Sequence, residues 1–375
     1  MNIIDLLKIL TEKQGSDLHI IAGLHPAARI NGKLKPLIEI ERLSPQRTQE
    51  LIYSILSDEQ KDSFENNVNS RFELDFAYTV PGMGRYRVNI HRQRGTIAAT
   101  VRALANTIPK LEELGLPDSI FKFTKAKKGL VLVTGPTGSG KSTTLAAIID
   151  KINSTREDHI ITIEDPIEYL HNSKKSYVTQ REVGLNGDTL SFKNALKYAL
   201  RQDPDVILIG EMRDCETIGI AITSAETGHL VFGTLHTASA AQTIGRIVDV
   251  FPAEQQPQIR VQLASNLVGV ISQVLLPRSD GSGRCLACEV MIANSAVKNN
   301  VRAGKTEAIN QIIQTSAAEG MLSMDQSLLR LCRERKIDVK DAELYIQDKT
   351  TYNRLIQLGH RTNMGSNGQI LSMSN

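Results

Sequence analysis

The run GPTGSGKST at residues 135–143 has the residue types and the spacing of a phosphate-binding loop. Its glycines let the backbone turn N–H groups toward a phosphate, and the ammonium of Lys141 can neutralise the β and γ phosphates. The hydroxyl of Ser142 is an oxygen ligand of the kind that Mg²⁺ prefers. A strand pattern, GLVLVT, precedes the run and a helical pattern follows it, so the loop also gains the positive end of a helix dipole. We therefore expect ATP and Mg²⁺ to bind at Gly135, Pro136, Thr137, Gly138, Ser139, Gly140, Lys141, Ser142 and Thr143.

Three acids follow the apolar run HIITI, at Glu164, Asp165 and Glu168. If that run is a strand of the same sheet, the acids lie at its carboxyl end, where ligands sit in open α/β sheets. A carboxylate there can polarise a water for attack on the γ-phosphate. Glu164 is our first choice for this role, and a solvated acidic loop is the alternative.

A second acidic strand end, DVILIGEMRD, carries Glu211. The aspartate that is usual at such a strand end is absent, because Gly210 stands before Glu211. Metal ligation would therefore rest on Ser142, Glu211, phosphate oxygens and water. The alternative is that Glu211 only caps the end of the strand.

Two histidines flank the apolar run of GHLVFGTLH, at His229 and His236. Their spacing places a strand between them, so both would lie near strand ends and could respond to the γ-phosphate. A histidine in such a position is more often a packed or capping residue, and this is the alternative for each of them.

Cys285 and Cys288 form a lone CxxC pair. A structural zinc site needs two more ligands at compatible spacing, and neither Cys332 nor His360 obviously provides them. We therefore favour two semi-buried residues on a strand over a zinc site.

The order of the predicted helices and strands around these residues indicates two domains. From residue 129 onward, short apolar runs alternate with helical patterns, which predicts a parallel α/β sheet. The N-terminal part predicts a small α+β domain. Its expected elements are a helix near 3–13, strands near 19–21 and 27–30, a helix after Ser44, and an arginine-rich hairpin within 72–102.

The predicted domain boundaries follow from Pro, Gly and charge-rich stretches. A linker at 101–118 contains Pro109, Gly115 and Pro117, and a basic run follows it. The last residues are polar and lack a hydrophobic period, which predicts a flexible tail. The division is therefore 1–100, 101–118, 119–349 and 350–375.

Composition excludes several classes of protein. With 41% apolar and 23% charged residues, the chain is of the ordinary globular kind. A net charge of +3 does not favour nucleic acid as a partner. Four cysteines predict a reducing cytoplasm rather than a disulfide framework. No segment approaches the roughly 18 to 20 apolar residues that span a bilayer, so we expect any membrane association to come through a partner.

Four segments, GPTGSGKST, TIEDPIEYLH, ILIGEMRD and GHLVFGTLHT, resemble in order and spacing the motifs of the secretion ATPases. The segments QGSDLHIIAGLHPAARINGKL and RYRVNIHRQRG are similar to the N-terminal domain of the type IV pilus retraction ATPases, the PilT family. The resemblance implies a homohexameric motor for pilus retraction, with a PAS-like domain, a RecA-like P-loop domain and ATP between them. It also implies an inner-membrane platform protein as partner.

The resemblance assigns roles to residues. It implies that Glu164 activates water, that Glu211 supports Mg²⁺, and that His229 and His236 are the histidines of the family's histidine box. It also implies that N-terminal arginines complete the nucleotide site, as suits a developing phosphate charge. The candidates are Arg85, Arg87, Arg92, Arg94 and Arg102.

One segment departs from the family pattern. The retraction ATPases carry Ala-Ile-Arg-x-Leu-Ile-Arg, where this chain has Ala-Val-Lys-Asn-Asn-Val-Arg at 296–302. Lys298 replaces an arginine and Asn300 an apolar residue. An accessory paralogue of the retraction motor and an assembly ATPase therefore remain alternatives. A ring-shaped nucleic-acid translocase and a regulatory subunit that does not hydrolyse ATP are further alternatives.

Overall fold

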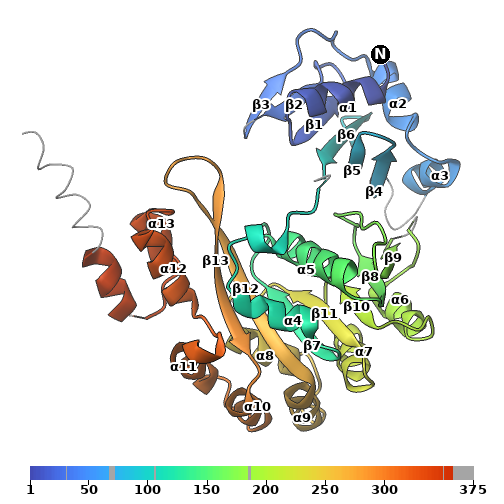
Figure 1. Cartoon of the computed structure of the whole chain (residues 1–375). Coiled ribbons are helices and arrows are strands. Elements are labelled where there is room, and N and C mark those ends of the chain that lie inside the picture. The colour runs from blue at the N-terminus through green and yellow to red at the C-terminus, as the bar shows by residue number, and fades with distance from the viewer. Residues whose placement is uncertain (31, 67–71, 105–106, 185–186, 349, 358–375) are drawn as a thin grey trace, which may run out of the picture. The chain divides into compact units, whose positions relative to one another are not determined.

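The computed structural model describes residues 1–30, 32–66, 72–104, 107–184, 187–348 and 350–357. The chain divides into two compact units, each described separately below (Figure 1). The first unit includes two segments that come from within the predicted ATPase range. Its segments are 1–108, 163–171 and 180–195, and those of the second are 109–162, 172–179 and 196–375.

The first unit contains a six-stranded antiparallel sheet in the order β3-β2-β1-β6-β5-β4. The expected helices and the first two strands are confirmed. The expected hairpin has a third strand, because the chain turns again at Arg94 and Gly95, which both have positive φ. The elements are α1 (Ile3–Glu12), β1 (Asp17–Ile21), β2 (Ala27–Ile30), β3 (Lys33–Pro36), α2 (Pro45–Tyr53), α3 (Asp58–Asn66), β4 (Glu73–Val80), β5 (Gly84–Gln93) and β6 (Thr96–Ala103).

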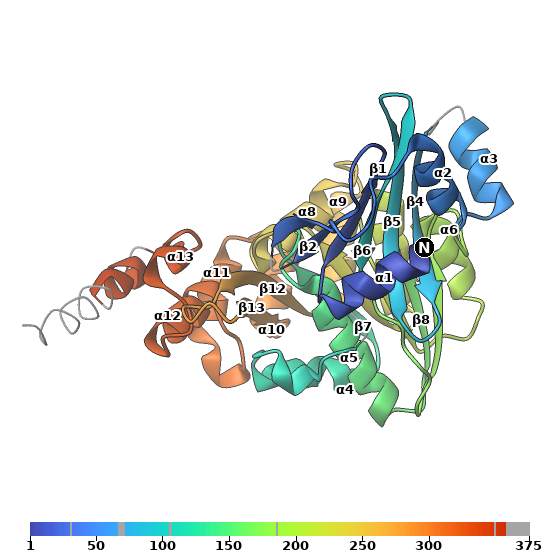
Figure 2. The same cartoon turned by 90° about the horizontal axis from the view of Figure 1, so that it is seen from above.

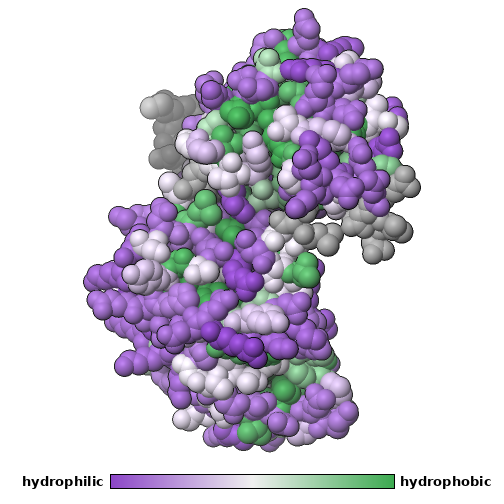
Figure 3. Space-filling model, turned by 90° about the vertical axis from the view of Figure 1, so that its right-hand side faces the viewer, coloured by the Kyte–Doolittle hydropathy of each residue, from purple (hydrophilic) through white to green (hydrophobic). Residues whose placement is uncertain are grey.

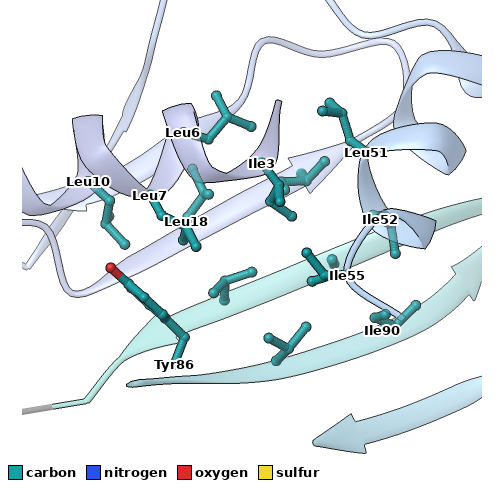
Figure 4. Packing of buried hydrophobic residues seen from close by; sticks show 14 of the residues in the cluster. Ile3, Leu6, Leu7, Leu10, Leu18, Leu51, Ile52, Ile55, Tyr86 and Ile90 are labelled. Atoms are coloured by element: carbon teal, nitrogen blue, oxygen red, sulfur yellow. The ribbon is translucent and has the colours of Figure 1, made fainter. Parts of the chain in front are cut away.

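The core of the first unit forms where α1 and α2 pack on one face of this sheet. A capping box between Asn2 and Asp5 starts α1, and its apolar residues recur at helical spacing. Figure 4 shows Leu7 and Leu10 of α1 pointing toward Leu18 and Tyr86 on the strands. All four side chains are buried. The opposite face of the sheet carries Arg85, Arg87 and Arg102, which alternate with the buried residues of β5 and β6.

The second unit contains a seven-stranded sheet in the order β13-β12-β7-β11-β10-β8-β9. The central strand β7 is parallel to β11 and β12, and β11 is parallel to β10. The edge strand β13 runs antiparallel to β12. The strands are β7 (Gly129–Thr134), β8 (His159–Glu164), β9 (Tyr177–Glu182), β10 (Val206–Ile209), β11 (Leu230–Leu235), β12 (Leu267–Pro277) and β13 (Arg284–Ile292).

Helices cover both faces of this sheet (Figures 1 and 2). On one face α4 and α5 pack against alternate residues of the buried strands, whereas α7, α8 and α9 lie on the other. The strands are apolar throughout because both faces are covered. This arrangement confirms the predicted α/β class. The helices are α4 (Phe121–Lys125), α5 (Lys141–Thr155), α6 (Phe192–Ala199), α7 (Cys215–Glu226), α8 (Ala240–Asp249) and α9 (Gln256–Asn266).

The C-terminal helices form a smaller core beside the β12–β13 hairpin (Figure 2). Residues 350–357 are helical and Leu355 is fully buried in this core, so the predicted flexible tail is wrong for this part. The reason is that this polar-looking segment contains an apolar side chain that packs against the core. The rest of the predicted tail, 358–375, lies outside the described residues. The helices are α10 (Ser295–Arg302), α11 (Ala308–Thr315), α12 (Met324–Arg333) and α13 (Val339–Glu343).

A buried carboxylate joins this C-terminal part to the sheet. Glu289 on β13 accepts the backbone N–H of Ala240, at 2.8 Å, and that of Met324. These N–H groups open α8 and α12, and both lack an acceptor within their own helix. Burial raises the pKa of Glu289, although the two N–H groups act to lower it.

The two cysteines of the CxxC pair both lie on β13, as a strand pattern predicts. Cys288 is fully buried, and burial raises the pKa of its thiol to about 12. Cys285 packs against the C-terminal core. His360, which we considered as a ligand, lies outside the described residues.

Hydrophilic side chains cover most of the face shown in Figure 3, and hydrophobic side chains show between them in patches. Such patches are common on folded proteins. Within the described ranges, no helix combines the length and the apolar character that crossing a membrane requires.

Gly269 gives a test of the packing of the second unit. A Cβ added there would lie 2.4 Å from the Phe123 ring and 2.6 Å from the carbonyl oxygen of Met291. We expect Gly269→Ala to destabilise this unit by about 3 kcal/mol, because the Met291 backbone cannot move away from the added methyl group. Gly245→Ala is the matched control, since nothing lies within 4 Å of a Cβ there. Denaturant unfolding should separate the two variants, and equal midpoints would contradict the packing described.

Candidate nucleotide-binding and hydrolysis site

The predicted phosphate loop joins β7 to α5, as the sequence pattern requires. Gly138 and Gly140 have φ of 78° and 88°, a region that side chains with a Cβ rarely adopt. Gly140 is also the N-cap of α5, and no side chain of the described residues caps this helix. The positive end of the α5 dipole therefore faces the loop without a side-chain cap, as at sites that bind an anion.

The charged and hydroxyl groups of the loop suit a nucleotide with its metal. Lys141 donates from Nζ to the carbonyl oxygens of Gly135, at 2.9 Å, and Pro136, at 3.1 Å, which holds its ammonium over the loop. Ser142 follows in the first turn of α5. A lysine, a hydroxyl and the N-terminus of a helix fit triphosphate oxygens, and hydroxyl and carboxylate oxygens fit Mg²⁺.

Two predicted residues meet at the carboxyl edge of the sheet. β10 and β11 run parallel, with Ile209 opposite Gly233, so the residues that follow them reach the same edge. Glu211 follows β10 and His236 follows β11. Nε2 of His236 lies 3.1 Å from Oε1 of Glu211. The structure therefore brings this predicted pair together.

Arg213 also holds Glu211, and the sequence reasoning did not include it. Its Nε lies 2.5 Å from Oε1 and its Nη2 2.7 Å from Oε2. Burial acts to raise the pKa of Glu211, but Arg213 and His236 outweigh it and the pKa is lowered. The carboxylate is therefore anionic at neutral pH, as metal ligation requires.

A cavity of about 330 Å³ opens beside this pair. The sequence offers a signal for Arg213, because it is a basic residue only two positions after Glu211. The cavity is lined by Glu211, Met212, Arg213, Ile218, Leu235, His236, Thr237, Arg246 and Val250.

Glu164 is the last residue of β8, as predicted. Its Oε1 accepts a hydrogen bond from Nε2 of Gln180, at 3.2 Å, and Gln180 also donates to the carbonyl oxygen of Tyr169, at 2.9 Å. Gln180 lies on β9 and thereby orients the carboxylate. No motif marks Gln180 in the sequence, since its place depends on strands pairing across a long connection.

His229 does not join His236. It precedes β11, and its carbonyl oxygen accepts the N–H of Gly129 at the start of β7. Because β11 has six residues, His229 is about 20 Å from His236 along the strand, at the end opposite the loop. Its Nδ1 lies 2.9 Å from the carbonyl oxygen of Ser224, where α7 ends. Within one subunit this is a capping contact, which was the alternative considered.

The predicted arginines fall into different surroundings within the first unit. Arg85 pairs with Glu182 and donates from Nε to the carbonyl oxygen of Ile167, at 3.2 Å. Arg92 lies over the Phe72 ring, 4.2 Å from its centroid. Both guanidinium groups therefore already have partners.

The other three arginines are exposed: Arg87 lies 3.9 Å from Asp75 with 47% of its side chain exposed, and 63% of the Arg102 side chain is exposed. Arg102 donates from Nε to Asp17, at 2.8 Å, and its cross-strand neighbour is Arg87. Burial acts to raise the pKa of Asp17, but Arg102, Ser16 and Arg29 lower it overall. Arg94 is exposed in the turn after β5. Arg87, Arg94 and the outer part of Arg102 are thus the better placed for an external anion.

The family model described as "Type II/IV secretion system protein" matches residues 5–365. The chain belongs to this family. A twitching motility protein of Neisseria gonorrhoeae is 48% identical to it over 333 residues, which cover 89% of this chain and 87% of the relative.

Within the type II/IV secretion family, two more similarities identify the branch. A type IV pilus retraction ATPase, PilT, of Pseudomonas aeruginosa is 47% identical over 342 residues, covering 91% of this chain and 97% of the relative. A crystal structure of the pilus retraction motor PilT with bound ADP has a TM-score of 0.88 and 48% identity, covering 94% and 99% of the two chains. The predicted resemblance to the retraction ATPases is confirmed.

Proposed function

We propose that this chain is an ATP-hydrolysing motor subunit that drives type IV pilus retraction. The carrying observation is a complete phosphate loop beside the Glu211–His236 pair, in a chain similar over nearly its whole length to proteins named for retraction. ATP is the substrate, and ADP and phosphate are the products.

Each residue of the site has a separate role in ATP binding or hydrolysis. The N–H groups that open α5 and the ammonium of Lys141 bind the phosphates. Ser142 and Glu211 would hold Mg²⁺, whose charge neutralises the phosphates. Glu164, oriented by Gln180, accepts the proton of the attacking water. His236 is placed to respond through its contact with Glu211.

The assembly that we propose is a homohexamer. Arginines of the first unit would complete the nucleotide site, and the exposed Arg87, Arg94 and Arg102 are the first to examine. Arg85, largely buried against Glu182, and Arg92, which lies over the Phe72 ring, come after them. The proposed location is the cytoplasmic base of the pilus, against an inner-membrane platform protein. His229 would act from a surface away from its own phosphate loop.

The departure at residues 296–302 favours one alternative, an accessory paralogue of the motor. The segment still forms α10, with Val297 and Val301 buried. Asn300 donates to the carbonyl oxygen of Ala296, at 2.9 Å, and Lys298 to that of Ser265, at 3.4 Å. Both altered residues are thus accommodated, and their effect would be on a surface contact rather than on the fold.

Deletion of the gene tests the proposal. A retraction motor removes pilin from the fibre base, so its loss should leave surface pili in excess and abolish twitching. Pili counted by electron microscopy and twitching zones on agar measure the two effects. Complementation with the wild-type gene should restore both.

The other functions predict different results. Loss of surface pili after deletion would indicate an assembly ATPase and contradict retraction. Pili and twitching both at wild-type levels would contradict any essential motor role. A protein that releases no phosphate from Mg-ATP would contradict the enzymatic part of the proposal.

A further inference from the structure

Gln273 lies directly behind the phosphate loop, outside every motif discussed above. It is on β12, next to β7, and is 1% exposed. Its Nε2 donates to the carbonyl oxygen of Ser139 at 2.8 Å, in a buried contact across 134 residues of sequence. Gln273 therefore reaches the middle of the loop from a strand of the central sheet.

Two glycines of the loop also pack on Gln273. A Cβ added at Gly135 would lie 2.2 Å from the backbone oxygen of Gln273, and one at Gly140 would lie 3.3 Å from its Nε2. The loop thus has Gln273 against its beginning, its middle and its end. Arg284, at the start of β13, adds a weaker contact from Nη1 to the carbonyl oxygen of Gly138, at 3.4 Å.

The contact with Ser139 determines where the next N–H group points. A trans peptide is planar, and its C=O and N–H point in opposite directions. Holding the Ser139 carbonyl against Gln273 therefore turns the Gly140 N–H away from the sheet. Within the described residues this N–H has no acceptor, and it stands at the N-terminus of α5. Phosphate oxygens are acceptors of the kind it lacks.

The amide of Gln273 is not explained by stability. Its Oε1 is buried and finds no hydrogen-bond partner among the described residues. A buried amide with an unpaired oxygen is costly, so the side chain contributes only through the hydrogen bond that it donates. What the amide does provide is the donor to Ser139.

We propose that Gln273 is a positioning residue that holds the phosphate loop in its nucleotide-binding form before the nucleotide arrives. Without this donor, the Ser139–Gly140 peptide can rotate, and binding must first order it. The cost then falls on nucleotide affinity rather than on the chemical step. The inference rests on the proposed phosphate site at residues 135–143.

Titration calorimetry of the full chain with ADP tests this inference. Gln273→Met keeps the shape without the donor, and Gln273→Asn keeps the amide but shortens its reach. We expect each to weaken ADP binding about tenfold, the equivalent of one buried hydrogen bond. The KM for ATP should rise by a similar factor, while kcat stays within about threefold of wild type.

Ser327→Ala is the matched control, because it removes a buried hydroxyl that accepts the N–H of Cys288 away from the loop. Its ADP affinity should equal that of the wild type. The inference is overturned if both Gln273 variants bind ADP within about twofold of wild type, or if Ser327→Ala loses as much affinity. Thermal melts without ADP should show that Gln273→Met is folded, and Gln273→Asn decides the question if it is not.

Lys141→Ala, measured in parallel, separates this inference from the proposed function. If Lys141→Ala loses ADP and the Gln273 variants do not, only the role of Gln273 is contradicted. If Lys141→Ala binds ADP normally, the proposed phosphate site itself is contradicted.

Discussion

Glu164→Gln should abolish ATP turnover while ATP still binds. Glutamine keeps the size of the side chain and a hydrogen-bond partner for Gln180, but it cannot accept the proton of the attacking water. We expect the turnover number to fall by about 10³-fold, within the range that positioned acid–base groups provide. Phosphate release at saturating Mg-ATP measures the loss, and binding of a non-hydrolysable ATP analogue checks that the site is intact.

Glu168→Gln provides the control for this result, since Glu168 is an exposed acid in the same connection. It should turn over ATP at the wild-type rate. If Glu164→Gln also did so, the carboxylate at the end of β8 would be only a solvated acid. Equal losses in both variants would point to the charge of the connection rather than to one proton acceptor.

Lys141→Ala should remove nucleotide binding altogether at ordinary concentrations. Its ammonium is held over the loop by the carbonyl oxygens of Gly135 and Pro136, so it is in place before the phosphates arrive. Losing charge-assisted hydrogen bonds to two phosphates should weaken ADP and ATP binding by about a hundredfold or more. Titration calorimetry measures this directly.

Lys151→Ala is the matched control on the same helix. Lys151 lies in α5 and pairs with Glu112 at 2.7 Å, so its removal changes the charge of α5 equally, away from the phosphate loop. Nucleotide affinity should not change. Normal affinity in Lys141→Ala would mean that the GPTGSGKST run is a glycine-rich turn and not the binding loop.

The features that local pattern determines could be predicted from the sequence. Apolar runs flanked by glycine and acids indicated the strands of the parallel sheet, and the spacing in GPTGSGKST placed the loop between β7 and α5. The residues that support the site could not be predicted in the same way. Gln180 and Gln273 reach Glu164 and Ser139 only because distant strands pair, and no local signal reports that pairing.

The two histidines show the same distinction. Both flank one strand, and a pattern that finds the strand treats its two ends alike. The two ends of a strand in a parallel sheet differ in function, because ligands bind at the carboxyl edge. His236 is at that edge and His229 is not. The third strand of the hairpin, β6, was missed because the turn at Arg94 and Gly95 interrupts an alternation that otherwise continues.

The bridge made by Glu289 has a mechanical consequence. One carboxylate holds the first N–H groups of α8, which follows the His236 segment, and of α12 in the C-terminal core. Separating these helices would leave a buried carboxylate and two N–H groups without hydrogen-bond partners, which is costly. The C-terminal core is therefore mechanically coupled to the segment next to the hydrolysis edge. A force that displaces one of them also acts on the other.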